Sequence, residues 1–133
     1  MKKLLFGLLG LIGLLMCHWA SAAPLKIVYH LNEMEKATIV ISSIREILKT
    51  YPDAEIIAVI HGPAIIRLAK SDGLMNEFKD LLESGVEIGA CNTSILKSSL
   101  RPGLMVEGVT LLSQGGVQKI IELQQLGYIY IKI

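Results

Sequence analysis

Cysteine is nearly absent from this sequence, and its scarcity excludes a fold held together by disulfides. The 133-residue chain contains two cysteines, Cys17 and Cys91. Cys17 falls in an N-terminal segment that we expect to be removed, so Cys91 is left without a disulfide partner. Exported domains usually use their cysteines in pairs. A lone thiol in an oxidising compartment is therefore either buried and inert, as free cysteine often is, or reactive and used.

A surplus of charge of one sign is also missing. The 13 Lys and Arg residues oppose 12 Asp and Glu residues, and removal of Lys2 and Lys3 with the N-terminal segment leaves 11 against 12. Proteins that bind nucleic acids need a strongly basic face. We therefore expect no nucleic acid among the partners of this protein.

The sequence contains none of the short motifs of common nucleotide-binding and hydrolytic sites. It lacks a phosphate loop, a G-x-S-x-G nucleophile and an H-E-x-x-H zinc motif, and Gly115-Gly116 opens a helix without the G-x-G-x-x-G spacing. His30, His61 and Cys91 are residue types that bind zinc or copper. Because they form no compact ligand motif, we disfavour that alternative and expect neither a metal nor a cofactor.

The N-terminal segment has the pattern of a secretory signal peptide. Two lysines precede an apolar run at 4–16, and positions 20–22 are Ala-Ser-Ala, a small-x-small cleavage pattern. The run is shorter than the about 20 apolar residues of a membrane span. We expect residues 1–22 to be removed, which leaves one domain, residues 23–133, in the periplasm or secreted and without a membrane contact.

Two alternatives to cleavage are weaker. One is an uncleaved anchor. The other is a lipoprotein attached through Cys17, but Met16 occupies a position where lipoprotein processing requires a small residue.

From Pro24 onward, β-rich runs alternate with helical patterns. Apolar residues of 37–51 recur at i, i+3, i+4 and i+7, which indicates an amphipathic helix. The consecutive apolar residues of EIIAVI are typical of a strand covered on both faces. Strands are predicted at 25–31, 55–60, 86–91, 105–111 and 128–133. Helices are predicted at 37–51, 64–70 and 74–82, from 92, and from a cap at Ser113 to Gly127. This alternation predicts an α/β fold, a flavodoxin-like three-layer sandwich with a mainly parallel five-stranded sheet.

Binding sites in open parallel sheets form outside the carboxyl ends of the strands. The residues at these ends that we expect to bind a ligand or react are His30, Asn32, His61, Gly62, Cys91, Asn92 and Thr93. With a strand order of 2-1-3-4-5, the first strand would lie between the second and the third. Both histidines and the cysteine would then lie toward one edge of the sheet.

Cys91 is the strongest candidate for chemistry because it lies at a strand-to-helix junction. A helix N-terminus or a nearby imidazolium lowers the pKa of a thiol, and the thiolate is the reactive form. His30 and His61 would orient the thiolate or donate a proton; the alternative for each is a structural imidazole bonded to the backbone. Arg67, Lys97 and Arg101 would attract an anionic sulfur compound, and the alternative is ordinary surface charge.

The mature chain resembles the DsrE/DsrF-like family of small sulfur-relay proteins, in its exported branch. The resemblance is carried by KIVYHLN at the first strand, IIAVIHGPAI at the second, GVEIGAC before Asn92-Thr93, and IELQQLGYIYIKI at the end. It implies a flavodoxin-like fold, assembly into homo-oligomers, and a Cys91 that carries sulfur as a persulfide. Relay members have a basic pair and a glycine soon after the cysteine, whereas NTSILKSSLRPG is longer and retains only Arg101 before Pro102-Gly103.

The leading hypothesis is an exported sulfane-sulfur carrier that needs no cofactor and does not turn over alone. Its partners would be a sulfur donor or acceptor protein, or a small sulfur compound. Catalytic roles are expected for Cys91, His30 and His61, and ligand binding for the other strand-end residues and Arg101. The alternative is a small-ligand-binding or assembly module without catalysis, in which Cys91 is structural.

Overall fold

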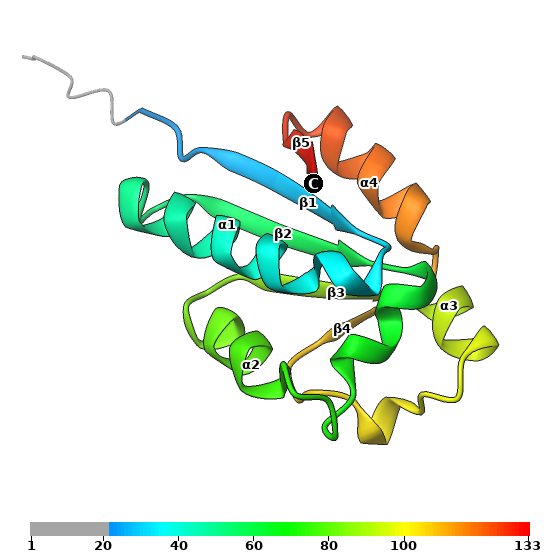
Figure 1. Cartoon of the computed structure of the whole chain (residues 1–133). Coiled ribbons are helices and arrows are strands. Elements are labelled where there is room, and N and C mark those ends of the chain that lie inside the picture. Colours follow the sequence, from blue (N-terminus) through cyan, green and yellow to red (C-terminus); the bar gives the residue numbers. More distant parts are fainter. Residues whose placement is uncertain (1–21) are drawn as a thin grey trace, which may run out of the picture.

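A single five-stranded sheet organises the computed structural model, which describes residues 22–133 (Figure 1). The strands are β1 (Lys26–Leu31), β2 (Glu55–Ile60), β3 (Glu87–Cys91), β4 (Thr110–Leu112) and β5 (Ile129–Lys132). The α-helices are α1 (Ala37–Thr50), α2 (Met75–Glu83), α3 (Asn92–Lys97) and α4 (Gly116–Gln125), and the 3-10 helices are η1 (Met34–Lys36), η2 (Gly62–Leu68) and η3 (Pro102–Leu104). All neighbouring strands are parallel, which confirms the α/β three-layer fold. The expected signal peptide lies outside the described residues, apart from Ala22.

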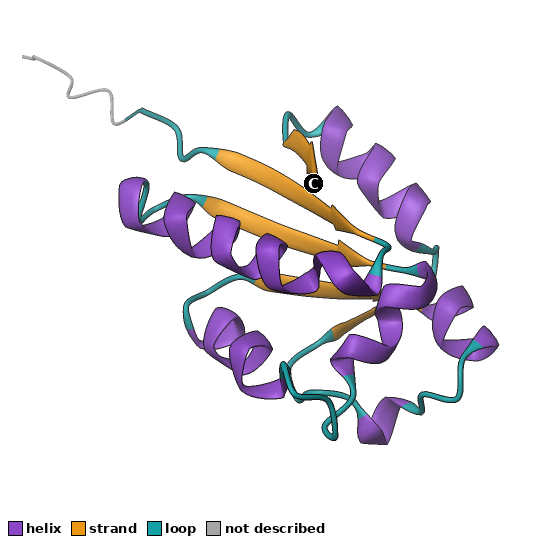
Figure 2. Ribbon diagram, in the orientation of Figure 1, coloured by secondary structure: helices purple, strands orange, loops and turns teal. Residues whose placement is uncertain are grey.

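The helices are divided between the two faces of the sheet (Figure 2). The chain steps from β1 to β2 to β3 in one direction, so right-handed crossovers place α1 and α2 on the same face. From β4 it returns across the sheet to β5, and this reversed step places α4 on the opposite face. The side of α4 is therefore the thinner of the two outer layers.

The strands supply alternate side chains to two apolar cores. Tyr29 and Leu31 of β1 belong to the large core that also contains α1, while Val28 belongs to a small core with Ile120 and Leu123 of α4. β2 divides its residues in the same way, and five of its six residues are buried. The prediction that EIIAVI is covered on both faces is thus confirmed.

The observed strand order is β4-β3-β2-β1-β5, and the expected order 2-1-3-4-5 is wrong. β1 does not separate β2 from β3; it lies between β2 and the last strand. Strand order depends on which side of the existing sheet each crossover packs against, and the local sequence of a strand carries little information about that choice. His30, His61 and Cys91 still come from three adjacent strands, β1, β2 and β3.

Three predicted boundaries also differ from the structure. The fourth strand is confined to Thr110–Leu112 instead of 105–111, because Met105 pairs antiparallel with Ala69 and the Val106 amide donates to the Leu68 carbonyl. The short helix expected at 64–70 is the 3-10 helix η2. The last helix begins at Gly116 with Gly115 as its N-cap, not from a cap at Ser113.

Among the described residues, no helix combines the length and the apolar character that crossing a membrane requires.

Truncation of a core residue tests the packing of α1. Ile44 is fully buried, so Ile44→Ala is expected to lower the free energy of unfolding by about 2–5 kcal/mol. Ile39 on the same helix is 50% exposed, and Ile39→Ala is the matched control, with an expected change within about 0.5 kcal/mol. Urea denaturation measures both. Equal losses in the two variants would contradict the assignment of the buried face.

Candidate functional site

Four side chains form a row across the α4 side of the sheet, near the carboxyl ends of its strands. Successive residues of a strand point to opposite faces. His30 follows Val28 by two residues, and His61 follows Val59 by two, so both histidines continue the α4-facing positions of β1 and β2. The row runs from Tyr130 on β5 through His30 and His61 to Cys91 on β3.

The start of α4 packs against the end of this row that is formed by His61 and Cys91. A Cβ added at Gly116 would lie 3.4 Å from the Cβ of Cys91 and 3.2 Å from the Cβ of His61. Only a glycine fits comfortably at this distance. The preceding Gly115 has φ +93°, a conformation that other residues rarely adopt, and it turns the chain from β4 into the helix. The pair Gly115-Gly116 therefore brings the start of α4 against both residues and the backbone amide of Gly116 to the cysteine.

Hydrogen-bond donors around Cys91 favour its thiolate. The residue is 6% exposed, and burial by itself raises the pKa of the thiol. The hydroxyl of Ser94 and the amides of Gly116, Ser94 and Thr93 act in the opposite direction, and the net result is a pKa below the ordinary value. Cys91 is the N-cap of α3, which places the amides of Thr93 and Ser94 near its sulfur. They favour the anion, although the thiol forms no geometric capping hydrogen bond with them.

Ser94 links Cys91 by hydrogen bonding to the backbone that follows β2. The amide of Gly62 donates to Ser94 Oγ at 2.8 Å. Because that oxygen already accepts this bond, its own proton is free to point at the sulfur. Gly62, the residue that follows His61, thus contributes through its backbone and not through direct contact with the thiol.

The two histidines are joined edge to edge. Nε2 of His30 and Nε2 of His61 are in hydrogen-bond contact, with ring centroids 4.6 Å apart and ring planes inclined by 17°. Such a separation with a direct nitrogen contact leaves no overlap of the ring faces, so the rings lie nearly in one plane. On its other side, His30 Nδ1 is 2.6 Å from the hydroxyl of Tyr130.

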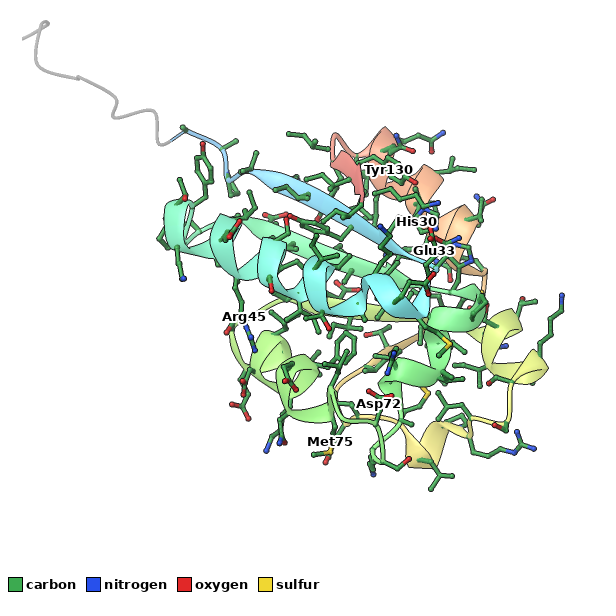
Figure 3. The ribbon with its side chains drawn as sticks, viewed as in Figure 1. His30, Glu33, Arg45, Asp72, Met75 and Tyr130 are labelled. Atoms are coloured by element: carbon green, nitrogen blue, oxygen red, sulfur yellow. The ribbon has the colours of Figure 1, made fainter. Side chains whose placement is uncertain are left out.

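The surroundings keep both imidazoles uncharged at neutral pH. Burial, followed by His61 and then Lys132, lowers the pKa of His30 from 6.5 to about 4. Burial and then Lys132 also lower the pKa of His61. Lys132 is paired with Glu33 at 3.7 Å, and Figure 3 shows His30, Glu33 and Tyr130 near one another.

The expected ligand-binding residues are only partly brought to this site. Asn32 lies beside Gly62, and its Oδ1 is buried without a hydrogen-bond partner among residues 22–133. Thr93 contributes its amide, and its side chain is exposed; Asn92 is the first, half-buried residue of α3. Arg101 precedes η3, and its guanidinium donates to the carbonyl of Leu100, with no bond to the row of Cys91 and the histidines in the described part of the chain.

A pocket lies between η2 and α3, next to the cysteine. Its cavity volume is about 270 Å³, and its lining residues are Gly62, Pro63, Ile65, Ile66, Ser94, Lys97 and Ser98. Ser94 belongs both to this pocket and to the donors around Cys91. Lys97 is the cation in the lining, which agrees with its expected role near the cysteine better than the position of Arg101 does.

Four further residues belong to the site and were not predicted from the sequence: Ser94, Gly116, Tyr130 and Lys132. A signal for two of them was present, because the alternation in YIYIKI places Tyr130 and Lys132 on the same face of one strand. Gly115-Gly116 lacks the spacing of a nucleotide motif, and the sequence gives no other sign of its contact with Cys91. No three His, Cys, Asp or Glu residues of the described range are grouped as the ligands of a metal would be.

Removal of the Ser94 hydroxyl tests the cause of the lowered thiol pKa. Ser94→Ala is expected to raise the pKa of Cys91, because a donor to the thiolate is lost. Thr93→Ala is the matched control: it deletes a hydroxyl from the same helix but keeps the backbone amide that faces the sulfur. The thiolate is titrated by its ultraviolet absorbance, taken as a difference against Cys91→Ser. Identical titration curves for Ser94→Ala and the wild type would contradict the assignment.

The histidine pair predicts a loss of stability in acid. His30 binds its proton at about 4 in the folded chain and at 6.5 without the fold, so the unfolded state holds more protons between these two values. The free energy of unfolding should therefore decrease as the pH falls through this window. His30→Gln removes the titrating group and should show a smaller decrease in urea denaturation across the same range. Parallel curves for the two proteins would rule out this origin.

Comparison with known proteins identifies the fold. No protein-family profile matches the chain, and no curated protein matches it. Among solved structures, the chain is similar to MTH1491, a protein of unknown function from Methanobacterium thermoautotrophicum, with a TM-score of 0.77 and 22% identity over 82% of this chain and 99% of that one. It is also similar to the ychN protein from E. coli, with a TM-score of 0.68 and 13% identity over 82% and 99% of the two chains. A third similar structure is BT1422, a conserved protein of unknown function from Bacteroides thetaiotaomicron, with a TM-score of 0.65 and 18% identity over 81% and 94%. These similarities establish a shared α/β fold.

Proposed function

We propose that this protein carries sulfane sulfur as a persulfide on Cys91, as an exported relative of the DsrE/DsrF-like sulfur-relay proteins. The observation that carries the proposal is the set of donors around Cys91: one hydroxyl and three backbone amides favour its thiolate despite burial. The thiolate is the form of cysteine that attacks sulfur. A cysteine that serves only to fill the core has no need of these donors.

The same donors suit both halves of a relay. The Cys91 thiolate attacks the outer sulfur of a donor and becomes a persulfide, and the thiolate of an acceptor then attacks the outer sulfur of that persulfide. In the second half, Cys91 is the leaving group and regains its negative charge. Stabilisation of that charge by Ser94 and Gly116 makes Cys91 a better leaving group, which favours delivery of the sulfur.

The pocket beside Ser94 is the proposed entry for a small sulfur compound. Its lining is mainly apolar, with Lys97 as a cation and with serine hydroxyls. This combination suits a small anion with an apolar part. Asn32 and Gly62 lie at the same end of the sheet, whereas the structure gives Arg101 no contact with Cys91, so we assign the electrostatic role to Lys97.

Export and self-association belong to the same proposal. Its setting is the periplasm or the exterior of the cell, after removal of residues 1–22. Exposed apolar side chains on α4 and β5 offer an area for contact between copies of the chain in a homo-oligomer; they include Val117, Ile121, Leu126 and Ile129.

A small-ligand-binding or assembly module remains the second candidate. It is favoured by the low exposure of Cys91, 6%, which limits the approach of a bulky donor. In this case the pocket holds a ligand, and the thiol completes the core without reacting.

Mass spectrometry of the intact protein distinguishes the two candidates. After exposure to polysulfide, the wild type is expected to gain the mass of one or more sulfur atoms, and Cys91→Ser is expected to gain none, because the attacking thiolate is gone. Residues 23–133 are used for both proteins, so that Cys91 is the one cysteine present in the wild type. Loading that persists in Cys91→Ser, or fails in the wild type, would contradict the relay and leave the binding module.

A further inference from the structure

A continuous chain of hydrogen bonds leads from the surface to the vicinity of Cys91. Its outer end is the hydroxyl of Tyr130, a residue that is 39% exposed. That hydroxyl contacts Nδ1 of His30 at 2.6 Å, and Nε2 of His30 contacts Nε2 of His61. Both ring nitrogens of His30 are therefore used, and His30 connects two partners.

The inner end of this chain lies on the Cys91 side of His61. Nδ1 is the ring nitrogen nearer to the Cβ of His61, and that Cβ lies beside the same point of Gly116 as the Cβ of Cys91. Among the described residues, Nδ1 of His61 has no hydrogen-bond partner, whereas its Nε2 is occupied by His30. This nitrogen is therefore the unoccupied inner end of the hydrogen-bonded series.

Two arrangements of protons satisfy these contacts without charging either ring. In the first, the Tyr130 hydroxyl donates to His30 Nδ1, His30 Nε2–H donates to His61 Nε2, and His61 Nδ1 carries a proton. In the second, His61 Nε2–H donates to His30 Nε2, His30 Nδ1–H donates to the tyrosine oxygen, and His61 Nδ1 is a free base. The two arrangements contain the same number of protons, and they differ in position: in the first, His61 carries its proton on Nδ1 at the inner end, and in the second on Nε2.

We propose that Tyr130, His30 and His61 form a neutral proton relay between solvent and the sulfur chemistry at Cys91, and that the compounds it serves are persulfides of thiols. The proposal rests on the persulfide function of Cys91. Within it, His61 touches the reacting groups, whereas His30 and Tyr130 act through it.

Loading uses the first arrangement. The Cys91 thiolate attacks the outer sulfur of a donor R–S–SH, the bond between the two donor sulfurs breaks, and R–S⁻ leaves with the bonding pair. His61 gives its Nδ1 proton to R–S⁻ and receives the proton of His30 on Nε2. His30 receives the phenol proton on Nδ1, and the Tyr130 oxygen takes a proton from solvent, which leaves the second arrangement.

Discharge restores the first arrangement. His61 Nδ1 accepts the proton of an acceptor R′–SH, the protons move back along the chain, and one proton passes from Tyr130 to solvent. R′–S⁻ attacks the outer sulfur of the Cys91 persulfide, and the Cys91 thiolate leaves. The sum is R–S–SH plus R′–SH giving R–SH plus R′–S–SH, with no oxidant or reductant.

The charges around these three side chains favour proton transfer between uncharged rings over proton transfer through a charged imidazolium. Lys132 faces the pair from β5, and its partner Glu33 follows β1. The pKa values of both histidines are lowered, so neither ring holds an extra proton at neutral pH. A proton that enters at one end must therefore leave at the other. On the inner side, the titratable group that lies with His61 against the same point of Gly116 is Cys91.

Tyr130→Phe tests the relay, and Tyr128→Phe is its matched control. Tyr128 immediately precedes β5, and its hydroxyl donates to Glu55 at 3.1 Å instead of to a histidine. The donor is cysteine persulfide, the acceptor is glutathione, and the rates of loading and discharge are measured against pH in water and in heavy water. General acid–base catalysis contributes typically about 100-fold or more, so loss of the outer end of the chain is expected to slow both steps roughly tenfold and to change their pH profile. Tyr128→Phe is expected to match the wild type.

A spectroscopic readout accompanies the rates. Nitrogen NMR of the histidine side chains at neutral pH is expected to show two uncharged rings, with a shift of His30 Nδ1 in Tyr130→Phe and none in Tyr128→Phe. Loading of the wild type with equal rates in the two tyrosine variants would overturn the relay alone, and so would a charged imidazolium at neutral pH. Failure of the wild type to load at all would overturn the persulfide function and the relay with it.

Discussion

The close approach of α4 to the carboxyl ends of β2 and β3 is the contact on which the rest of the site depends. Gly115 turns the chain and Gly116 leaves the space of a missing side chain, so that a helix start lies directly against Cys91 and His61. A larger residue at position 116 would push α4 away from both. The Gly116 amide that faces the cysteine and the cover over the histidine therefore share one cause.

The state of Cys91 follows from a competition between burial and hydrogen bonding. Removal of a thiolate from water is costly, and burial alone would keep the thiol protonated. Hydrogen bonds to a charged group are worth about 1.5–3 kcal/mol each, and the chain supplies four donors, from Ser94 and from three amides. The donors prevail because two separate segments, the starts of α3 and α4, converge on the same atom. Either helix start alone would supply only part of the set.

For the histidine pair, by contrast, the environment favours the uncharged form. Burial is the main cause of the lowered pKa of both histidines, and Lys132 adds to it for both rings. For His30, the neighbouring imidazole of His61 also opposes a positive charge. The thiolate and the neutral imidazoles lie side by side on adjacent strands, so one end of the sheet stabilises an anion at β3 and excludes a cation at β1 and β2. This arrangement separates the nucleophile from the groups that move protons, which is what the proposed sulfur transfer requires.

Local sequence patterns were sufficient to predict most of the elements and the strand ends at which chemistry could occur. Hydrophobic periodicity and the position of Cys91 before a helix are local properties, and they placed His30, His61 and Cys91 at the carboxyl ends of three strands. The strand order β4-β3-β2-β1-β5 could not be predicted in this way, because the side on which a crossover packs depends on contacts between distant segments. The tertiary structure also brought Tyr130, 100 residues away in the chain, to His30, and a helix start from beyond β4 to Cys91. The residue types were readable in advance, but hydrogen bonds between segments far apart in sequence form only when the complete sheet sets the distances between them.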